Sequence, residues 1–372
     1  MTDSLIRNYS PEGMLRFPID TGLIARHERI GDPLVDPIAD LIMEKKPAMP
    51  DLLAFVESEA EAGNVKCRTF LAEVQDVPAW VNFAAMQPGA ELFLRNSLLS
   101  TAVFVLHSLV LTYVPVNQAR VLVHTGRLRG QVLRRLYETA TLVRDVLESD
   151  ALKPGAKGWR SVLRVRILHA VVRRSILAAG RWQHEIQPIN QTELAQTGTL
   201  FGYVVASGLE KLGVPVSAEE KESYHHLWRY ANWLQGVPDV WQVASFADEE
   251  MLHRELAERF YFPDANSFTL IESLFDALDM QAPFLMPKTV LKAFTAKLMQ
   301  PAVAERISLQ PDSLALNAVQ LLQNALPTAG LRYQLVPFLR DVELVIGRAY
   351  FHNLIAQGLG GVEADFKRQG AA

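Results

Sequence analysis

The feature that most restricts how this chain folds is a series of sequence blocks with helical periodicity. Prolines and glycines separate these blocks. Within each block the apolar residues recur at intervals of three or four, and no convincing period-two strand appears. Pro154-Gly155, Gly213-Val214-Pro215 and Gly236-Val237-Pro238 are typical separators, since proline and glycine end helices. The expected helices span residues 40–60, 65–75, 90–113, 130–150, 160–179, 190–212, 217–235, 246–260, 265–278, 287–305, 311–325 and 332–356. The pattern therefore predicts an all-α fold.

A single domain over residues 1–372 is the expected organisation. A chain of this length buries enough surface to be stable without disulfides or structural metals. The sequence has no charged or Gly/Ser-rich linker, no internal repeat and no low-complexity tract. Residues 1–35 lack a strong helical period, and we expect them to form an extended arm over the core.

Composition excludes several classes of protein. The net charge of −4 gives no basic excess, so a nucleic-acid partner is not expected. The one cysteine, Cys67, excludes a disulfide framework and a cysteine-rich zinc site. The first residues, Met1 to Arg7, do not resemble the start of a secretory signal. Together these features predict a protein of the reducing cytoplasm.

The stretch from Leu98 to Val116 carries no charge and is nearly long enough to cross a membrane. It also contains polar residues such as His107, and it lacks the basic residues that anchor membrane spans. We therefore predict a buried central helix. Membrane association of this stretch is the less favoured interpretation.

The expected helix at 130–150 has an apolar stripe and a polar face. At 100° per residue, Arg135 lies at the margin of the stripe and Thr139 lies one turn later. Buried there, the two side chains would need polar partners. The alternative is that Arg135 extends to the surface and Thr139 bonds to its own backbone. The stripe contains Val132, Leu136, Thr139, Ala140, Val143, Val146 and Leu147, and the opposite face contains Arg134, Glu138, Arg144, Asp145 and Glu148.

The expected helix at 160–179 is apolar on almost every side and places one histidine among β-branched residues. His169 lies between Val165 and Val172, on a face that also carries Val162 and Ile176, with Arg166 and Arg173 beside it. Such a face could hold a haem, with the imidazole on the iron and the guanidiniums near the propionates. The alternative is a core histidine hydrogen-bonded to a neighbour.

Five sequence motifs, in order, resemble one known family. This is the haem-dependent oxygenase family that includes bacterial latex-clearing protein and the fungal MpaB-type oxygenases. The resemblance is in register over roughly residues 70–240. The motifs are Thr125-Gly126-Arg127-Leu128, Arg134-Arg135-Leu136-Tyr137-Glu138-Thr139-Ala140, Val165-Arg166-Ile167-Leu168-His169-Ala170-Val171-Val172-Arg173, Pro188-Ile189-Asn190-Gln191 and His226-Leu227-Trp228-Arg229-Tyr230 followed by Gly236-Val237.

The resemblance implies a globin-reminiscent helical core that binds haem b, with His169 as the iron ligand. It also implies that Arg135 and Thr139 lie on the distal side and help to position dioxygen or the oxidised substrate. The family reaction is oxidative cleavage of an isoprenoid carbon–carbon double bond. Latex-clearing proteins have a lysine directly before the threonine, whereas this chain has Glu138. That carboxylate either acts as an acid/base group or pairs with a surface cation.

The resemblance implies dioxygen and a small apolar substrate as partners, and it leaves the oligomeric state open. A terpenoid or unsaturated lipid fits an intracellular protein better than a solid polymer does. A haem-binding sensor or carrier without catalysis is the main alternative. A di-iron site built on Glu222/His225 and Glu250/His253 is a weaker one, because no glutamate-bearing helix fits between these two pairs.

Overall fold

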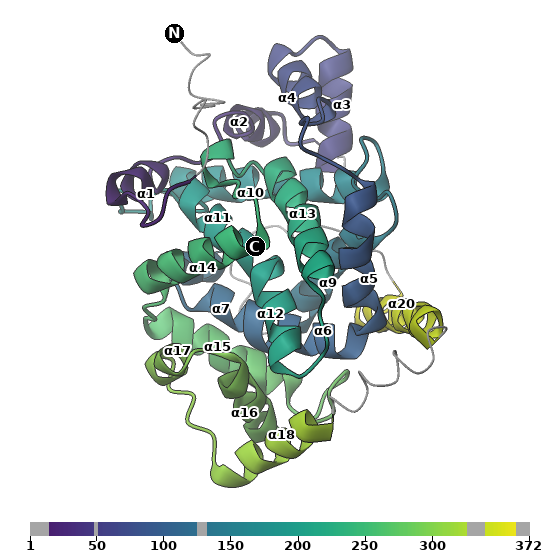
Figure 1. Cartoon of the computed structure of the whole chain (residues 1–372). Helices are drawn as coiled ribbons and strands as arrows, with labels where there is room; N and C mark the ends of the chain where they lie inside the picture. Colours follow the sequence, from purple (N-terminus) through teal and green to yellow (C-terminus); the bar gives the residue numbers. More distant parts are fainter. Residues whose placement is uncertain (1–14, 48–50, 125–131, 326–338, 362–372) are drawn as a thin grey trace.

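Helices are the only regular secondary structure in the part of the chain that the structure describes, as the sequence predicts. The computed structural model describes residues 15–47, 51–124, 132–325 and 339–361, and these ranges contain no strand (Figure 1). The α-helices are α1 (Thr21–His27), α2 (Asp36–Lys45), α3 (Leu52–Glu61), α4 (Val65–Gln75), α5 (Gln87–Arg95), α6 (Ser97–Val103), α7 (Leu109–Tyr113), α8 (Val116–His124), α9 (Val132–Leu147), α10 (Lys157–Ala178), α11 (Gln191–Phe201), α12 (Tyr203–Lys211), α13 (Ala218–Leu234), α14 (Phe246–Phe260), α15 (Ala265–Leu278), α16 (Lys288–Leu298), α17 (Pro301–Arg306), α18 (Ser313–Ala325) and α20 (Leu339–Gly358). Short 3₁₀ turns at Ala84–Met86 (η1) and Asp239–Trp241 (η3) and a π-helical turn at Phe104–Ser108 (η2) complete the elements.

Side-chain caps explain why three helices have the predicted bounds. Asn64 accepts hydrogen bonds from backbone N–H groups in the first turn of α4, and Ser245 does the same for α14. Asp264 forms a capping box at the start of α15. A cap of this kind satisfies N–H groups that have no partner inside the helix, so it fixes where the helix begins.

Other predicted helices are divided in the structure. The block 40–60 forms α2 and α3, with Pro47 after the first of them. The block 190–212 breaks at Gly202, between α11 and α12, and the block 287–305 breaks just before Pro301. Two short helices, α1 and α8, were not predicted. Seven to nine residues are too few for the helical period to stand out from the sequence.

The longest helix, α10, has 22 residues and runs through the interior (Figure 1). It packs against α2, α3, α9 and α13, so several sides of it are covered. Apolar residues on different sides of α10, among them Val162, Leu163 and Val165, are buried. This explains why the helix is apolar on almost every side. It also means that any polar residue on α10 needs a partner from a neighbouring helix.

Helices α5 and α13 cross at a glycine. A Cβ atom on Gly89 would lie 2.3 Å from the backbone nitrogen of Tyr224, so only glycine fits this crossing. The Gly89 N–H donates to the Ser223 hydroxyl at 2.7 Å, which joins the two helices in the core. The crossing fixes the position of α13, which carries part of the fifth motif.

The apolar stretch 98–116 mainly forms the buried segment α6–η2–α7, as expected for a core helix. Val103, Phe104, Leu106 and Val110 are buried. No single described helix is long and apolar enough to span a membrane, although the pair Ala84–Arg95 and Ser97–Tyr113, bent by 90°, passes a test of length and composition. The π-helical turn places His107 inside the core.

The described part of the expected arm, residues 15–35, is not extended throughout. It contains helix α1, and Ile19 and Ile24 pack into a second hydrophobic cluster with Trp241 and Leu256. Asp20 caps α1 by accepting from the backbone of Gly22 and Leu23. The arm lies against α11 and α14, at the opposite side of the molecule from α20 (Figure 1).

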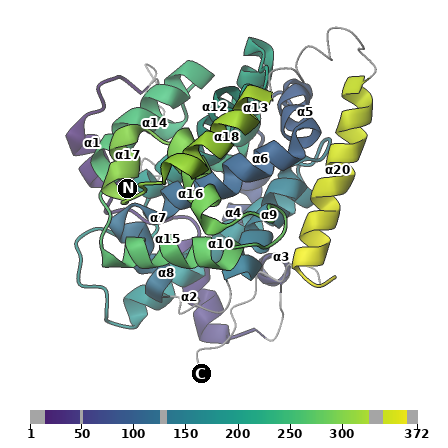
Figure 2. The ribbon, with the colours of Figure 1, turned by 90° about the horizontal axis from the view of Figure 1, so that it is seen from below.

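Helix α20 contacts α9 at the C-terminal end of the face that the sequence predicts to be polar and exposed. It runs along one edge of the molecule and packs against α5, α6 and α9 (Figure 2). Glu148, at the end of α9, accepts a hydrogen bond from His352 of α20 at 2.7 Å. Asp145, also expected on the polar face, is buried and accepts from the Ser161 hydroxyl at 2.7 Å. Of the predicted solvent face of α9, Asp145 is therefore bound by α10 and Glu148 by α20, while the Arg134 side chain stays exposed.

Candidate functional site

Helix α10 presents His169 as a neutral imidazole with a free ring nitrogen. The Nδ1 atom is buried and has no hydrogen-bond partner. Burial and the nearby Arg173 charge lower the pKa of His169 to about 4, against a smaller opposite effect of Asp32. The ring is therefore uncharged at neutral pH, which is the form that binds a metal ion.

Val165 and Val172 lie one turn before and about one turn after His169 on α10. Val165 is buried and Val172 is half-buried. Neither side chain can hydrogen-bond, so two of the four nearest positions on this helix are aliphatic, and Arg166 and Arg173 occupy the other two. The predicted apolar face also includes Val162 and Ile176, and both of these are buried.

The guanidinium of Arg166 is bound inside the protein. Its Nε donates to Asp32 Oδ2 at 2.7 Å and its Nη2 donates to Asp32 Oδ1 at 3.1 Å, while Nη1 reaches the Leu234 carbonyl oxygen at 3.3 Å. Both side chains of this ion pair are buried. The expected propionate role of Arg166 therefore competes with the acceptors that this side chain already binds inside the protein.

Arg173 has the same kind of environment. It forms an ion pair with Asp36, and it donates to the carbonyl oxygens of Pro188 at 3.0 Å and Ile189 at 2.7 Å. These two carbonyls belong to the motif Pro188-Ile189-Asn190-Gln191, which thereby contacts the helix that bears His169. A propionate role for Arg166 or Arg173 stays a prediction, and it would require one of these ion pairs to open.

Helix α9 carries Arg135 and Thr139, the two expected distal residues. Both side chains are half-buried, and the positive charge of Arg135 acts on the buried Tyr113. The Thr139 hydroxyl donates to the Arg135 carbonyl oxygen at 2.9 Å, which is the backbone bond that the alternative interpretation expects. A hydroxyl has one proton to donate, so Thr139 in this state can only accept a further hydrogen bond.

Glu138 forms an ion pair with Arg134 one turn earlier on α9, at 3.1 Å. The Arg134 side chain is exposed, so this arrangement corresponds to a carboxylate paired with a surface cation. An acid/base role of Glu138 would need this pair to separate. The first motif of the resemblance, Thr125-Gly126-Arg127-Leu128, lies outside the described residues.

Helix α11 lies within the predicted block 190–212, but the burial of its polar side chains was not predicted. Its side chains bond to residues outside the helix: Gln196 donates to the Tyr261 hydroxyl at 3.0 Å and accepts from Gln118 at 2.9 Å. The signal was available, since the run Gln191–Thr199 is too polar for a helix at this depth. Its buried polar residues, with the capping Asn190, are Asn190, Gln191, Thr192, Glu193, Gln196 and Thr199.

Glu193 is the least satisfied member of this group. Its Oε2 atom is buried without a hydrogen-bond partner. Burial raises the pKa of Glu193 to about 8, despite a hydrogen bond from Asn117 and the positive charge of Arg173. The carboxyl group is therefore mostly protonated at neutral pH. Arg173 influences both Glu193 and His169, so the two groups belong to one polar neighbourhood of α10 and α11.

The two Glu-x-x-His pairs do not form a metal site among the residues that the structure describes, which contain no group of three or more potential ligands. His225 Nδ1 pairs with Glu249 Oε2 at 2.7 Å, not with Glu222. Glu250 pairs with Arg254, and the His253 Nδ1 atom lies 2.9 Å from the Thr199 hydroxyl. The two histidines thus have partners on other helices, and Glu250 has its partner on its own helix.

Comparison with known proteins places the chain in a family. Residues 78–328 match the family described as the catalytic domain of ER-bound oxygenase mpaB/B' and rubber oxygenase. The chain belongs to this family. Its matched region includes α9, α10 and α11, and therefore every candidate site residue discussed above. The resemblance seen in the sequence motifs is thus confirmed.

Two further similarities agree with the family. The chain is 24% identical over 265 residues to a rubber oxygenase of Streptomyces sp. (strain K30). This match covers 67% of the chain but only 64% of the relative, so the chain spans less than two thirds of that protein's length. A solved structure of latex clearing protein in the closed state has a TM-score of 0.69 and 20% identity, and the match covers 88% of this chain and 91% of that one. At that identity it confirms the helical fold.

The resemblance implies a haem, and the residues around His169 suit the part of the site that would bind its iron. The imidazole is neutral, its Nδ1 atom is buried and unpartnered, and Val165 and Val172 beside it on α10 are aliphatic. A neutral histidine is a common axial ligand of haem b. The charged side fits less well, since Arg166 and Arg173 already have carboxylate partners.

Proposed function

We propose that this protein is a haem b-dependent oxygenase that uses dioxygen to cleave a carbon–carbon double bond of an apolar substrate. The observation that carries the proposal is the neutral, partly unpartnered imidazole of His169, on the central helix of a chain that belongs to an oxygenase family. The name of the rubber oxygenase relative supports an isoprenoid or an unsaturated lipid as the substrate class.

His169 would hold the haem through its imidazole, with Val165 and Val172 excluding water beside it. When bound, the haem iron supplies the activation of dioxygen. Arg135 is the better candidate for a hydrogen-bond donor on α9, because the Thr139 proton is already donated to the backbone. Thr139 is left to accept a hydrogen bond and to fix the orientation of the turn that carries Arg135.

Glu138 has a structural role in this proposal. Its ion pair with Arg134 holds the carboxylate against its own helix, α9. Latex-clearing proteins have a lysine at this position. The haem would then have no lysine from this position on its distal side. We also propose a cytoplasmic location, for which the single cysteine, buried and without a disulfide, is the supporting feature.

The first test is the absorption spectrum of protein expressed with a haem supply, with a pyridine haemochrome assay for the haem type. We expect a strong Soret band and about one haem b per chain. His169→Ala should lose most of the haem. His124→Ala is the matched control, because His124 is exposed at the end of α8 and bonds to the Arg120 carbonyl oxygen. Full haem occupancy in His169→Ala would show that His169 is not the ligand.

Activity is tested by oxygen consumption and by mass spectrometry of carbonyl products from terpenoids and unsaturated lipids. If Arg135 donates to the reacting oxygen, Arg135→Ala should lower turnover about 10²-fold while the haem content stays unchanged. Unaltered turnover would remove Arg135 from the mechanism. Glu138→Gln should leave turnover close to that of the wild type.

A haem-binding sensor or carrier is the second candidate. The observation that favours it is the Glu138–Arg134 pair, which leaves a carboxylate where the catalytic relatives in the resemblance have a lysine. A sensor would bind dioxygen or carbon monoxide reversibly and would consume no substrate. Stoichiometric product formation with repeated turnover would exclude it.

A further inference from the structure

Helix α20 has an apolar stripe on the side that faces away from the protein. Gly347, Phe351 and Ile355 form its buried side. At 100° per residue, the opposite side carries Val342, Val345, Ile346 and Ala349, which we call the outer stripe. The side chains of Val345 and Ile346 are 69% and 62% exposed, and Val342 is 37% exposed. The outward side of a surface helix normally carries charged residues, so the outer stripe is a surface without its partner.

The spacing of the outer stripe is that of a helix-pairing seam. Its four residues stand at positions i, i+3, i+4 and i+7, which is the repeat by which two helices pack side by side. Helix α20 lies along the edge of the molecule, where a second helix can approach it over its length (Figure 2). These features point to a helical partner.

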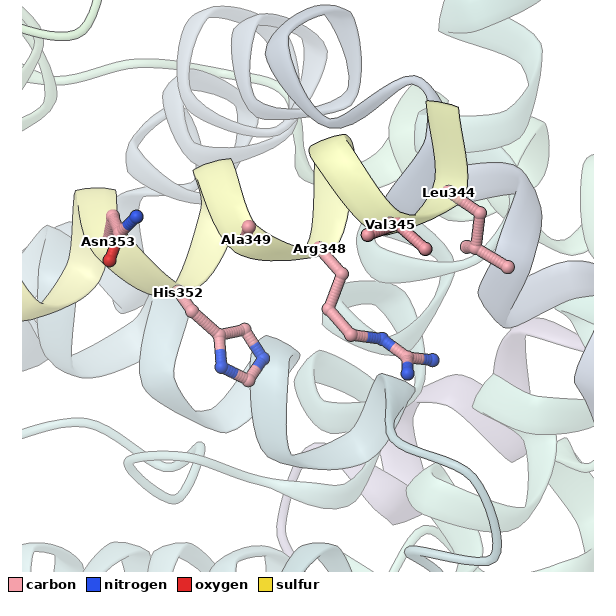
Figure 3. Close-up of a pocket in the computed structure, with 6 residues that line it drawn as sticks. All are labelled: Leu344, Val345, Arg348, Ala349, His352 and Asn353. Atoms are coloured by element: carbon pink, nitrogen blue, oxygen red, sulfur yellow. The ribbon is translucent and has the colours of Figure 1, made fainter. Parts of the chain in front are cut away.

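A hollow of about 380 Å³ lies beside the outer stripe. Val345 and Ala349 of the stripe line it, together with Arg348 and His352, whose side chains project from the same side of α20 (Figure 3). Arg348 and His352 also contact Glu148 of α9. One flank of the stripe is therefore recessed and carries basic groups.

We propose that the outer stripe is the interface of a two-fold symmetric dimer, in which α20 packs antiparallel against α20 of a second copy of this chain. A two-fold axis midway between Val345 and Ile346 places Val345 against the partner subunit's Ile346. It also places Val342 against the partner subunit's Ala349, because the members of each pair lie equally far from the axis. The stripe is thus complementary to itself in one register.

The charges beside the stripe agree with this register. Asp341 is exposed on the same flank as Arg348 and His352. In an antiparallel pair with a perpendicular two-fold axis, a flank meets the same flank of the partner. Asp341 therefore lies between the levels of the partner subunit's Arg348 and the partner subunit's His352, within about 3 Å along the helix axis of each. The Asp341 carboxylate and the Arg348 guanidinium are opposite in charge, so this register brings attractive groups together next to the hollow.

The size of the contact predicts a reversible dimer. One pair of helices buries less than the roughly 800 Å² per partner of a standard stable interface. We therefore expect the mass to depend on protein concentration. Sedimentation equilibrium of the full-length protein should give 41.6 kDa on dilution and approach twice that value at high concentration.

Val345→Glu tests the seam. Placing a carboxylate on each side of the two-fold axis should keep the protein at 41.6 kDa at every concentration. Leu314→Glu is the matched control: Leu314 is 80% exposed on α18, and its replacement should leave the association unchanged. A wild-type protein that stays monomeric overturns the proposal, as does equal dissociation of both variants. Binding of a monomeric wild type to phosphatidylcholine vesicles, lost in Val345→Glu, would assign the stripe to lipid instead.

Cysteine cross-linking tests the register. The only natural cysteine, Cys67, is buried, so an introduced thiol is the one accessible thiol among the described residues. Val345→Cys should form a disulfide-linked dimer on mild oxidation, because the two Val345 positions flank the axis. Leu314→Cys should give much less. Equal yields from both variants would show random collision and not the proposed pairing.

Discussion

The buried ion pair between Asp32 and Arg166 offers a sharp test of how the protein holds the helix that carries His169. Asp32→Asn removes the negative charge but keeps an oxygen that can accept hydrogen bonds. In the wild type, Asp32 Oδ1 accepts from the backbone of Leu34 and Val35 as well as from Arg166. The substitution therefore isolates the charge from the local turn.

The expected loss of stability follows from burial. Both side chains are less than a tenth exposed, and two hydrogen bonds of 2.7 and 3.1 Å join them. Removing one partner leaves the Arg166 charge buried and uncompensated, which typically costs about 3–5 kcal/mol of unfolding free energy. Asp40→Asn is the matched control, since Asp40 pairs with Arg174 at 2.6 Å but both side chains are exposed. That variant should lose no more than about 1 kcal/mol.

The assay is urea unfolding monitored by far-ultraviolet circular dichroism. The urea midpoints of the variants are compared, provided that the dependence of the unfolding free energy on urea concentration is the same in each. Burial raises the pKa of Asp32, but the charge and hydrogen bonds of Arg166 outweigh it and bring that pKa below its usual value. The folded protein therefore gains from the ionised carboxylate above the ordinary pKa of 3.8 and loses this gain as the pH falls through the folded pKa. The difference between wild type and Asp32→Asn should shrink in acid. Equal losses in Asp32→Asn and Asp40→Asn at neutral pH would refute the argument.

Two further predictions concern buried groups away from that ion pair. The folded protein keeps the proton of Glu193 up to about pH 8, whereas an unfolded chain releases it near 4.5, so stability should fall as the pH rises through this window. Glu193→Gln should remove that slope in urea unfolding at pH 5 and pH 8, and an unchanged slope would contradict the assignment. Gly89→Ala would place a Cβ atom 2.3 Å from the Tyr224 backbone nitrogen. The unfolding free energy should therefore fall by about 1–3 kcal/mol, which a lower melting temperature would show. A melting temperature equal to that of the wild type would show that α5 and α13 can separate without cost.

For helices that are long and have a side-chain cap, the sequence predicted the ends to within a few residues. The bounds of α4, α14 and α15 agree with the prediction, because period and cap are both local properties. The position of His169 among valines on α10 was also visible, since neighbours on one helix face follow from spacing alone. Breaks that depend on another helix were not visible. One is Gly202, where a Cβ atom would lie 2.2 Å from Glu249 Oε1.

The sequence by itself determined the all-α class, most of the helices and the motifs that place the chain in its family. Only the tertiary structure decided which polar groups are satisfied. Arg166 and Arg173 find their carboxylates more than 130 residues away, and Asp145 and Glu148 of the predicted solvent face of α9 find partners on α10 and α20. The periodicity of the sequence is local: over a few turns it shows which side of a helix is apolar. The partner of a buried charge comes from a remote segment, and only the folded chain brings the two together.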